Sequence, residues 1–253
     1  MTALKTLTAA LLLTSFAAPA MAANVVGLSG ENTLHWLDTE SWTETGSIDV
    51  TGVDGRLLGI DVRPADGMLY GVFADGTLAT IDPETGVATK VSTLATKLAD
   101  GVSATVDFNP VADKLRVMGS DGTSLRVTVD TGETVTDGSH SYADGASPNV
   151  IAGAYTNSYA GTEKTQLFNI DGKAGWLVLQ DPPNDGVLNA VGEIGVMPTE
   201  AGFDIASDGK GGNEAWLVIE GSFHTVNLET GATTEAGKID GANVRDIAIM
   251  PAM

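Results

Sequence analysis

The chain has 253 residues, with 33 acidic against 13 basic side chains and a formal net charge of −20. A charge of this sign disfavours binding to nucleic acid or to anionic membrane surfaces. The absence of cysteine excludes a disulfide scaffold, a zinc–thiolate site and a cysteine nucleophile, while 31 glycines and 43% hydrophobic residues favour short strands joined by tight turns over disorder.

The first element in chain order is a predicted secretory signal peptide, over residues 1–22. Lys5 precedes the apolar run AALLLTSFAA, and Ala20-Met21-Ala22 forms a small-x-small cleavage site. The run is too short to span a bilayer, and no later stretch predicts membrane insertion. We therefore expect cleavage near Ala22 and a periplasmic or secreted protein in which residues 23–253 form a single domain.

Residues 57–94 are typical of four short strands. The strands would be LLGIDV, MLYGVF, TLATID and VATKVSTL, because Gly, Pro or Asp stands at each junction between them. The same pattern recurs from residues 105, 149 and 201, and a last opening strand begins at Val244. At the other end of the chain, NVVGLSG, TLHWLDTES and WTETGSIDV match the second, third and fourth strands of a copy.

An aspartate in the opening strand gives the length of the repeat. Asp107 follows Asp61 by 46 positions, Asp204 follows after 97, which is two steps, and Asp246 follows after 42. Joining the C-terminus to residue 23 gives a last step of 46. A repeat that closes after five steps predicts a five-bladed β-propeller of four-stranded blades, in which the N-terminal strands complete the C-terminal blade. NVVGLSG must then pair with VRDIAIMP.

One segment also carries a family resemblance. VDFNPVADKLRVMGSDGTSLRVTVDTG, with AYTNSYAG and QDPPNDGVLNAVG after it, resembles the bacterial exported proteins catalogued as domain of unknown function 4394. The similarity covers nearly the whole chain after the signal peptide. Its most specific part is Asn-Pro-x-x-Asp-Lys-Leu-Arg-Val, in which Lys114 stands where the family usually has Arg. The resemblance implies a propeller-like exported domain and brings no catalytic residue.

The first candidate site is a ring of acids at one repeat position of the innermost strands: Asp61, Asp107, Asp204 and Asp246. Their carboxylates could bind Ca²⁺, which prefers six to eight oxygen ligands, although no calcium-loop motif supports this cofactor. In the alternative, structural interpretation each Asp accepts backbone N–H bonds within its own blade. The third copy has Val150 and Ala152 here, so the ring is incomplete.

The second candidate site consists of positions where the copies differ. If the inner strands end at one mouth of the channel, a polar ligand-binding cluster would comprise Arg63, Asn109, Tyr155 and Asn157. Arg116 and Arg126, on neighbouring strands of the second copy, could bind an anionic ligand bidentately. The alternative for both arginines is a salt bridge with a nearby acid, namely Asp107, Asp121 or Asp130.

The three histidines do not form a recognisable metal motif. His35 and His224 hold the same place on the third strands of adjacent copies, but two histidines without a third ligand do not define a metal site. We interpret them as packed or surface residues. His140 lies in the polar loop DGSHSYADG and is expected to be exposed.

No catalytic signature accompanies the repeat. The sequence contains no G-x-S-x-G, H-E-x-x-H or P-loop motif. It therefore favours a monomeric, non-enzymatic binding or scaffold protein whose ligand is an unidentified protein or small molecule. Two alternatives stay open: a propeller hydrolase or lyase with its site at the channel mouth, and an acidic metal-ion carrier.

Overall fold

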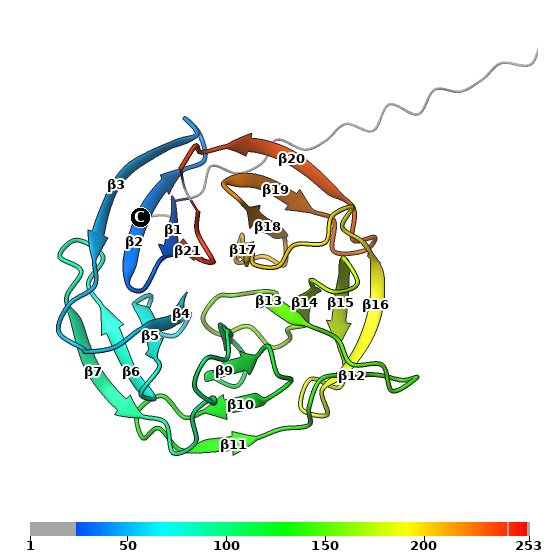
Figure 1. Ribbon diagram of the computed structural model, residues 1–253, viewed down its shortest axis with the longest axis horizontal. Helices are drawn as coiled ribbons and strands as arrows, with labels where there is room; N and C mark the ends of the chain where they lie inside the picture. The colour runs from blue at the N-terminus through cyan, green and yellow to red at the C-terminus, as the bar shows by residue number, and fades with distance from the viewer. Residues whose placement is uncertain (1–23, 242, 252–253) are drawn as a thin grey trace, which may run out of the picture.

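The computed structural model describes residues 24–241 and 243–251, and the predicted signal peptide lies outside the described residues. These residues form strands without any helix, so none of them forms a helix that could cross a membrane. Five sheets stand as blades around a common centre, which confirms the predicted five-bladed β-propeller (Figure 1).

Four blades follow one another along the chain. Blade 1 contains β4 (Leu57–Val62), β5 (Leu69–Phe73), β6 (Thr77–Ile81) and β7 (Ala88–Thr93). Blade 2 contains β8 (Ala104–Asn109), β9 (Lys114–Gly119), β10 (Ser124–Val127) and β11 (Thr134–Thr136). Blade 3 contains β13 (Val150–Tyr155), β14 (Leu167–Asp171), β15 (Trp176–Gln180) and β16 (Val187–Glu193). Blade 4 contains β17 (Gly202–Ser207), β18 (Asn213–Ile219), β19 (Ser222–Val226) and β20 (Thr233–Lys238).

Blade 5 joins the two ends of the chain, as the repeat predicted. Its strands, in spatial order, are β21 (Asp246–Met250), β1 (Asn24–Ser29), β2 (Thr33–Asp38) and β3 (Thr43–Asp49). The antiparallel register of β21 and β1 pairs Asn24 with Met250 and Leu28 with Asp246. The N-terminal strand therefore fills the place beside the last strand, and the ring is closed by backbone hydrogen bonds.

Burial falls from the centre of the ring to its rim. The inner strands β4, β8, β13, β17 and β21 contact one another in turn around the centre. All six residues of β4 are buried, whereas the outermost strand β7 exposes Thr89, Lys90 and Thr93. This gradient explains the sequence pattern, because inner strands have neighbours on both faces and are therefore mostly apolar. The core lies between adjacent blades: Leu34 of blade 5 packs in one cluster with Ile60 and Phe73 of blade 1.

The recurring Thr-Gly turns between third and fourth strands place neighbouring blades in close contact. Gly132 has a φ of +71°, and a Cβ there would lie 1.9 Å from the carbonyl oxygen of Thr93 in the preceding blade. Gly231 has a φ of +75°, and its Cβ would lie 2.5 Å from the carbonyl oxygen of Gly192. Glycine is required at both positions for its left-handed backbone and for its missing side chain.

One strand was not predicted. The two-residue strand β12 (Ser141–Tyr142) pairs in parallel with β16 and extends the sheet of blade 3 to five strands. It lies in the polar connection between blades 2 and 3. The segment is a strand only because it pairs with β16 at the outer edge of blade 3. Its composition alone is that of a loop.

Candidate functional site

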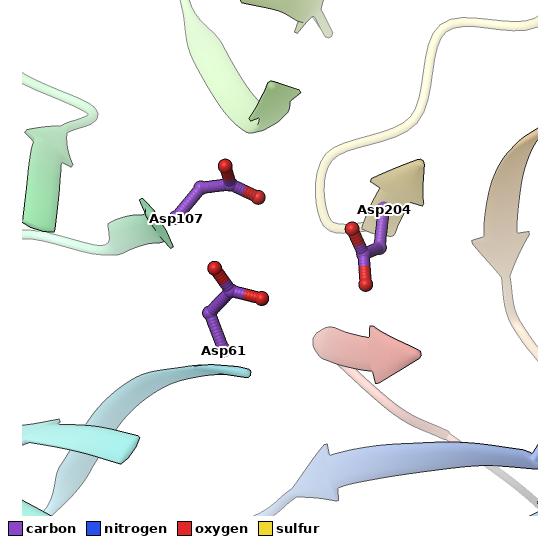
Figure 2. Close-up of side chains that lie close together, drawn as sticks. All are labelled: Asp61, Asp107 and Asp204. Carbon is purple, nitrogen blue, oxygen red and sulfur yellow. The ribbon is translucent and has the colours of Figure 1, made fainter. Parts of the chain in front are cut away.

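Three carboxylates meet at the centre of the propeller. Asp61 comes from β4, Asp107 from β8 and Asp204 from β17, and their side chains converge from three blades (Figure 2). One oxygen of each lies within 4.8 Å of an oxygen of each other one. All three residues are buried, with 4–6% of their surface exposed. We call these three residues the Asp triad.

Each member of the Asp triad links its blade to the next one. Asp61 Oδ2 accepts a hydrogen bond from Phe108 N at 2.6 Å, Asp107 Oδ1 from Tyr155 N at 3.0 Å, and Asp204 Oδ2 from Ile249 N at 2.6 Å. The structural interpretation expected each Asp to accept backbone N–H bonds within its own blade only. Each Asp of the triad accepts one from the next blade. Hydrogen bonds to a buried carboxylate are among the stronger ones in proteins.

Asp246 makes the same kind of bond but lies outside the triad. Its Oδ2 accepts a hydrogen bond from Ile60 N at 2.8 Å. Asp61 is bonded to the residue after Asp107, while Asp204 is bonded to the residue after Ala248. Ala248 thus holds the position in β21 that is level with the triad. The alignment of the repeats therefore placed Asp246 two residues away from its true level in the ring. The number of residues between two aspartates does not give their level when the copies differ in length.

The junction between blades 3 and 4 uses a different link, since blade 3 has Ala154 at the level of the triad. Asn157 N donates to Asn213 Oδ1 at 2.7 Å, and Asn213 Nδ2 donates to Asn157 Oδ1 at 3.0 Å. Asn157 has a φ of +55°, a left-handed conformation that Asn tolerates better than most residues. This amide pair replaces the missing carboxylate link. Asn157 is therefore hydrogen-bonded to Asn213 and helps to hold blades 3 and 4 together.

The three buried carboxylates lack a basic partner. No ion pair among the described residues involves Asp61, Asp107 or Asp204. Burial, and secondly the charges of the neighbouring aspartates, raise the pKa of Asp61 and Asp107 well above the usual range. Burial also raises the pKa of Asp204 to about 6 and that of Asp246 to about 8. The negative charge of these buried carboxylates therefore has to be neutralised, either by protons or by a bound cation.

We expect the metal-free protein to lose stability as the pH rises from 6.5 to 8.5. A carboxylate whose pKa is raised on folding stabilises the folded state below its unfolded pKa of 3.8, and that stability is lost as the pH rises through the folded value. His140, whose pKa burial lowers to about 4, acts oppositely only below about pH 6.5. We expect the free energy of unfolding to fall by at least about 1 kcal/mol, which lowers the midpoint of thermal unfolding by about 2–4 °C. Calorimetry in the presence of a chelator measures it, and a flat profile would contradict the expectation.

A cavity of about 420 Å³ lies over two members of the triad, Asp61 and Asp204, at one mouth of the channel. Asp61 and Asp204 belong to its lining, together with the residues that end the inner strands β4, β17 and β21. Tyr159, from the connection between β13 and β14, forms part of its wall, and Glu214 adds another acid. The cavity thus joins two of the buried carboxylates, those of Asp61 and Asp204, to the outside.

The polar cluster predicted at the channel mouth does not line one cavity. Asn109 and Tyr155 line a separate cavity of about 380 Å³ between blades 2 and 3. The Arg63 guanidinium is held by Asp113 at 2.6 Å and by Asp66 at 3.2 Å. Because Asn157 is bonded to Asn213, the four predicted residues have three different environments.

Arg116 and Arg126 share one carboxylate that sequence reasoning missed. Arg116 Nη1 lies 2.9 Å from Asp137 Oδ2, and Arg126 Nε lies 2.7 Å from the same atom. The proposed partners Asp107, Asp121 and Asp130 are not used in these ion pairs. Arg116 is 1% exposed and also donates to Tyr155 Oη, Ser124 Oγ and Asn184 Oδ1. The sequence signal that could have found it is the position of Asp137 directly after the fourth strand of the same copy, β11.

The histidines do not come together as a metal site. His35 bonds to Ser29 Oγ at 2.7 Å and lies 3.1 Å from Glu44. His224, on β19 of blade 4, belongs to none of the ligand groups found among the described residues. His140 was expected to be exposed and is buried, because the loop that carries it folds against Gly122.

Comparisons with known proteins give a family match and a structural likeness. A family model described as domain of unknown function (DUF4394) matches residues 33–248. A structure of a protein of unknown function from Bacteroides thetaiotaomicron VPI-5482 has a TM-score of 0.56 at 14% identity, with 93% of this chain and 68% of that chain covered. No curated protein matches the sequence. At this identity the structural likeness supports the fold alone.

Two further solved structures are less similar. A protein of unknown function from Bacteroides caccae has a TM-score of 0.48 at 13% identity, with 87% of this chain and 74% of that chain covered. The glutaminyl cyclase of Myxococcus xanthus has a TM-score of 0.44 at 13% identity, with 76% and 69% covered. Neither likeness bears on the function of this chain.

Proposed function

The chain belongs to the family described as domain of unknown function (DUF4394), and for this member we propose an exported, non-enzymatic binding protein that holds a divalent cation, Ca²⁺ in the first place, on the Asp triad. The signal-peptide pattern of residues 1–22 supports the export. The cation would lie at the floor of the mouth cavity, where a further ligand can approach it.

The convergence of three buried carboxylate oxygens from three blades is the observation that carries the proposal. A separation of up to 4.8 Å matches two oxygen ligands on opposite sides of Ca²⁺, which binds oxygen at 2.3–2.6 Å. Mg²⁺ requires shorter distances and a stricter octahedron. A divalent cation would also remove the repulsion that raises the pKa of these carboxyls.

The hydrogen bonding of the triad leaves capacity for a cation. Asp107 Oδ1 accepts the bond from Tyr155 N, whereas Asp107 Oδ2 accepts no hydrogen bond from the described residues. Asp61 and Asp204 each use their two oxygens for one backbone N–H apiece. A carboxylate oxygen that accepts one such bond keeps a second lone pair. The backbone bonds thus orient the ligands without consuming them.

The mouth cavity suggests how the cation would serve binding. Three carboxylates that each offer one oxygen leave three to five of the six to eight positions of Ca²⁺ to other oxygens. Waters or the oxygens of a small ligand can reach the triad through the cavity that Asp61 and Asp204 line. We therefore propose that the ligand class is rich in oxygen donors. This differs from a metal-ion carrier, which would rely on exposed acids.

Calcium titration of chelator-treated protein tests the proposal, with Asp107→Asn as the informative variant. We expect Ca²⁺ to raise the midpoint of thermal unfolding and to bind with heat, and Asp107→Asn to weaken binding by about tenfold or more, since a charge-assisted contact contributes about 1.5–3 kcal/mol. Isothermal titration calorimetry measures both.

Asp246→Asn is the matched control. It alters a buried carboxylate that also bonds to the next blade, at Ile60 N, but that lies outside the triad. It should lower stability and leave calcium affinity within about twofold. Equal calcium affinity in wild-type protein and Asp107→Asn, or no calcium binding by the wild type at millimolar concentration, would refute the proposal.

A further inference from the structure

A second cavity lies at the opposite end of the channel. Its volume is about 220 Å³, and residues at the beginning of the inner strands line it, whereas the mouth over the Asp triad is lined by residues at their ends. All five blades supply part of the lining, as Arg56 and Arg245 precede β4 and β21, while Ser103, Asn149 and Glu200 precede β8, β13 and β17. We call it the basal cavity.

The basal cavity contains an arginine whose side chain has no partner. The Arg56 guanidinium forms no hydrogen bond or ion pair with the described residues, and its Nε is buried. Every other arginine of the described chain is engaged by carboxylates or carbonyl groups: Arg63, Arg116, Arg126 and Arg245. A buried guanidinium N–H without an acceptor is unfavourable, so this group is suited to an acceptor that comes from outside.

Arg245 provides a second positive charge at a fixed position. Its Nη1 donates to the carbonyl oxygen of Leu58 at 2.7 Å and its Nε to that of Gly30 at 3.1 Å, with a further bond to Leu57. Carbonyl oxygens orient the guanidinium but do not neutralise it. Burial lowers the pKa of Arg245, and the Arg56 charge nearby lowers it further.

Neutral donors complete the basal cavity. The hydroxyl groups of Ser103 and Ser120 and the side-chain amide of Asn149 line it, and none of them bonds to another side chain of the described residues. Glu200 is the one acid of the lining and is exposed. Two arginines with neutral hydroxyl and amide groups are an unusual concentration of donors in a chain with a net charge of −20.

We propose that the basal cavity is an anion-binding site, which takes a small oxyanion or carboxylate on the Arg56 guanidinium. The planar fork of Arg binds two oxygens of such a group at once. The volume admits a group of the size of phosphate or a small dicarboxylate. The site is separate from the Asp triad, so the cation proposal and this one can fail independently.

Isothermal titration calorimetry tests the site, with inorganic phosphate and malonate titrated separately into the whole protein. The ionic strength is held at about 0.15 M, so that electrostatic screening by salt is the same in both experiments. We expect saturable binding of at least one of them, and the stronger of the two identifies the anion class. Arg56→Gln should weaken it by about tenfold or more, because a charged hydrogen bond to the anion is lost while no hydrogen bond or ion pair of the Arg56 side chain within the described residues is removed.

Lys90→Gln is the control, since it removes one positive charge from the exposed face of β7 and should change the affinity by less than twofold. Arg56→Gln should unfold at the wild-type midpoint. The proposal is overturned if neither anion binds below about 10 mM, or if Arg56→Gln binds as tightly as the wild type.

Discussion

Replacement of Arg116 by methionine should lower the free energy of unfolding by about 3–5 kcal/mol, the usual penalty for breaking a buried ion pair by removing one partner. Arg116 is 1% exposed, and its carboxylate partner Asp137 is also buried. Methionine fills a similar volume but donates no hydrogen bond. Tyr155 Oη, Ser124 Oγ and Asn184 Oδ1 would lose the group that each contacts at 2.8 Å.

Arg126→Met is the matched comparison, because Arg126 binds the same carboxylate from a half-exposed position. It should lower stability by about 1 kcal/mol or less, as exposed ion pairs contribute little. Urea unfolding at pH 7 gives both values. Equal losses in the two variants would show that Arg116 does not organise this network. The contrast tests the structural role that the sequence left open for both arginines.

Removal of residues 244–253 should abolish cooperative folding at 37 °C. The segment contains the buried side chains of Val244 and Ile247, and a fully buried side chain of this kind contributes about 1.5–3 kcal/mol. It also carries Asp246, which bonds to Ile60 N in blade 1, and the register that pairs β21 with β1. The combined loss of roughly 5 kcal/mol or more approaches the total stability of a typical domain.

A circular permutant separates loss of the strand from loss of its connection. The permutant would begin at Asn243, join the C-terminus to Asn24 through a short Gly/Ser linker, and end at Gly241. Because Met250 pairs with Asn24, the linker only has to close a hairpin. It should unfold cooperatively within a few degrees of the wild type, as followed by circular dichroism. An unfolded permutant, or a truncated protein with the wild-type midpoint, would contradict the closure described here.

The sequence by itself determined the architecture. Strand length and turn residues are local properties, so segments such as LLGIDV and TLATID could be recognised before any contact was known. The repeat then predicted that NVVGLSG lies beside the last strand, and the register of β1 and β21 confirms it. Periodicity was informative because each blade must bury the same faces against the next.

Only the tertiary structure decided how the polar side chains are used. The sequence treated Asp246 as equivalent to the other three aspartates, whereas the inter-blade bonds place Ala248 at that level. It assigned Asn157 to a ligand cluster, although Asn157 pairs with Asn213. It gave no role to Asp137, which belongs to a buried network, or to Arg56, which lines a cavity. A strand pattern fixes which residues alternate between faces, but the partner of a carboxylate or guanidinium depends on where neighbouring blades meet. Those meeting points are set by side-chain packing across the ring, which no local pattern contains.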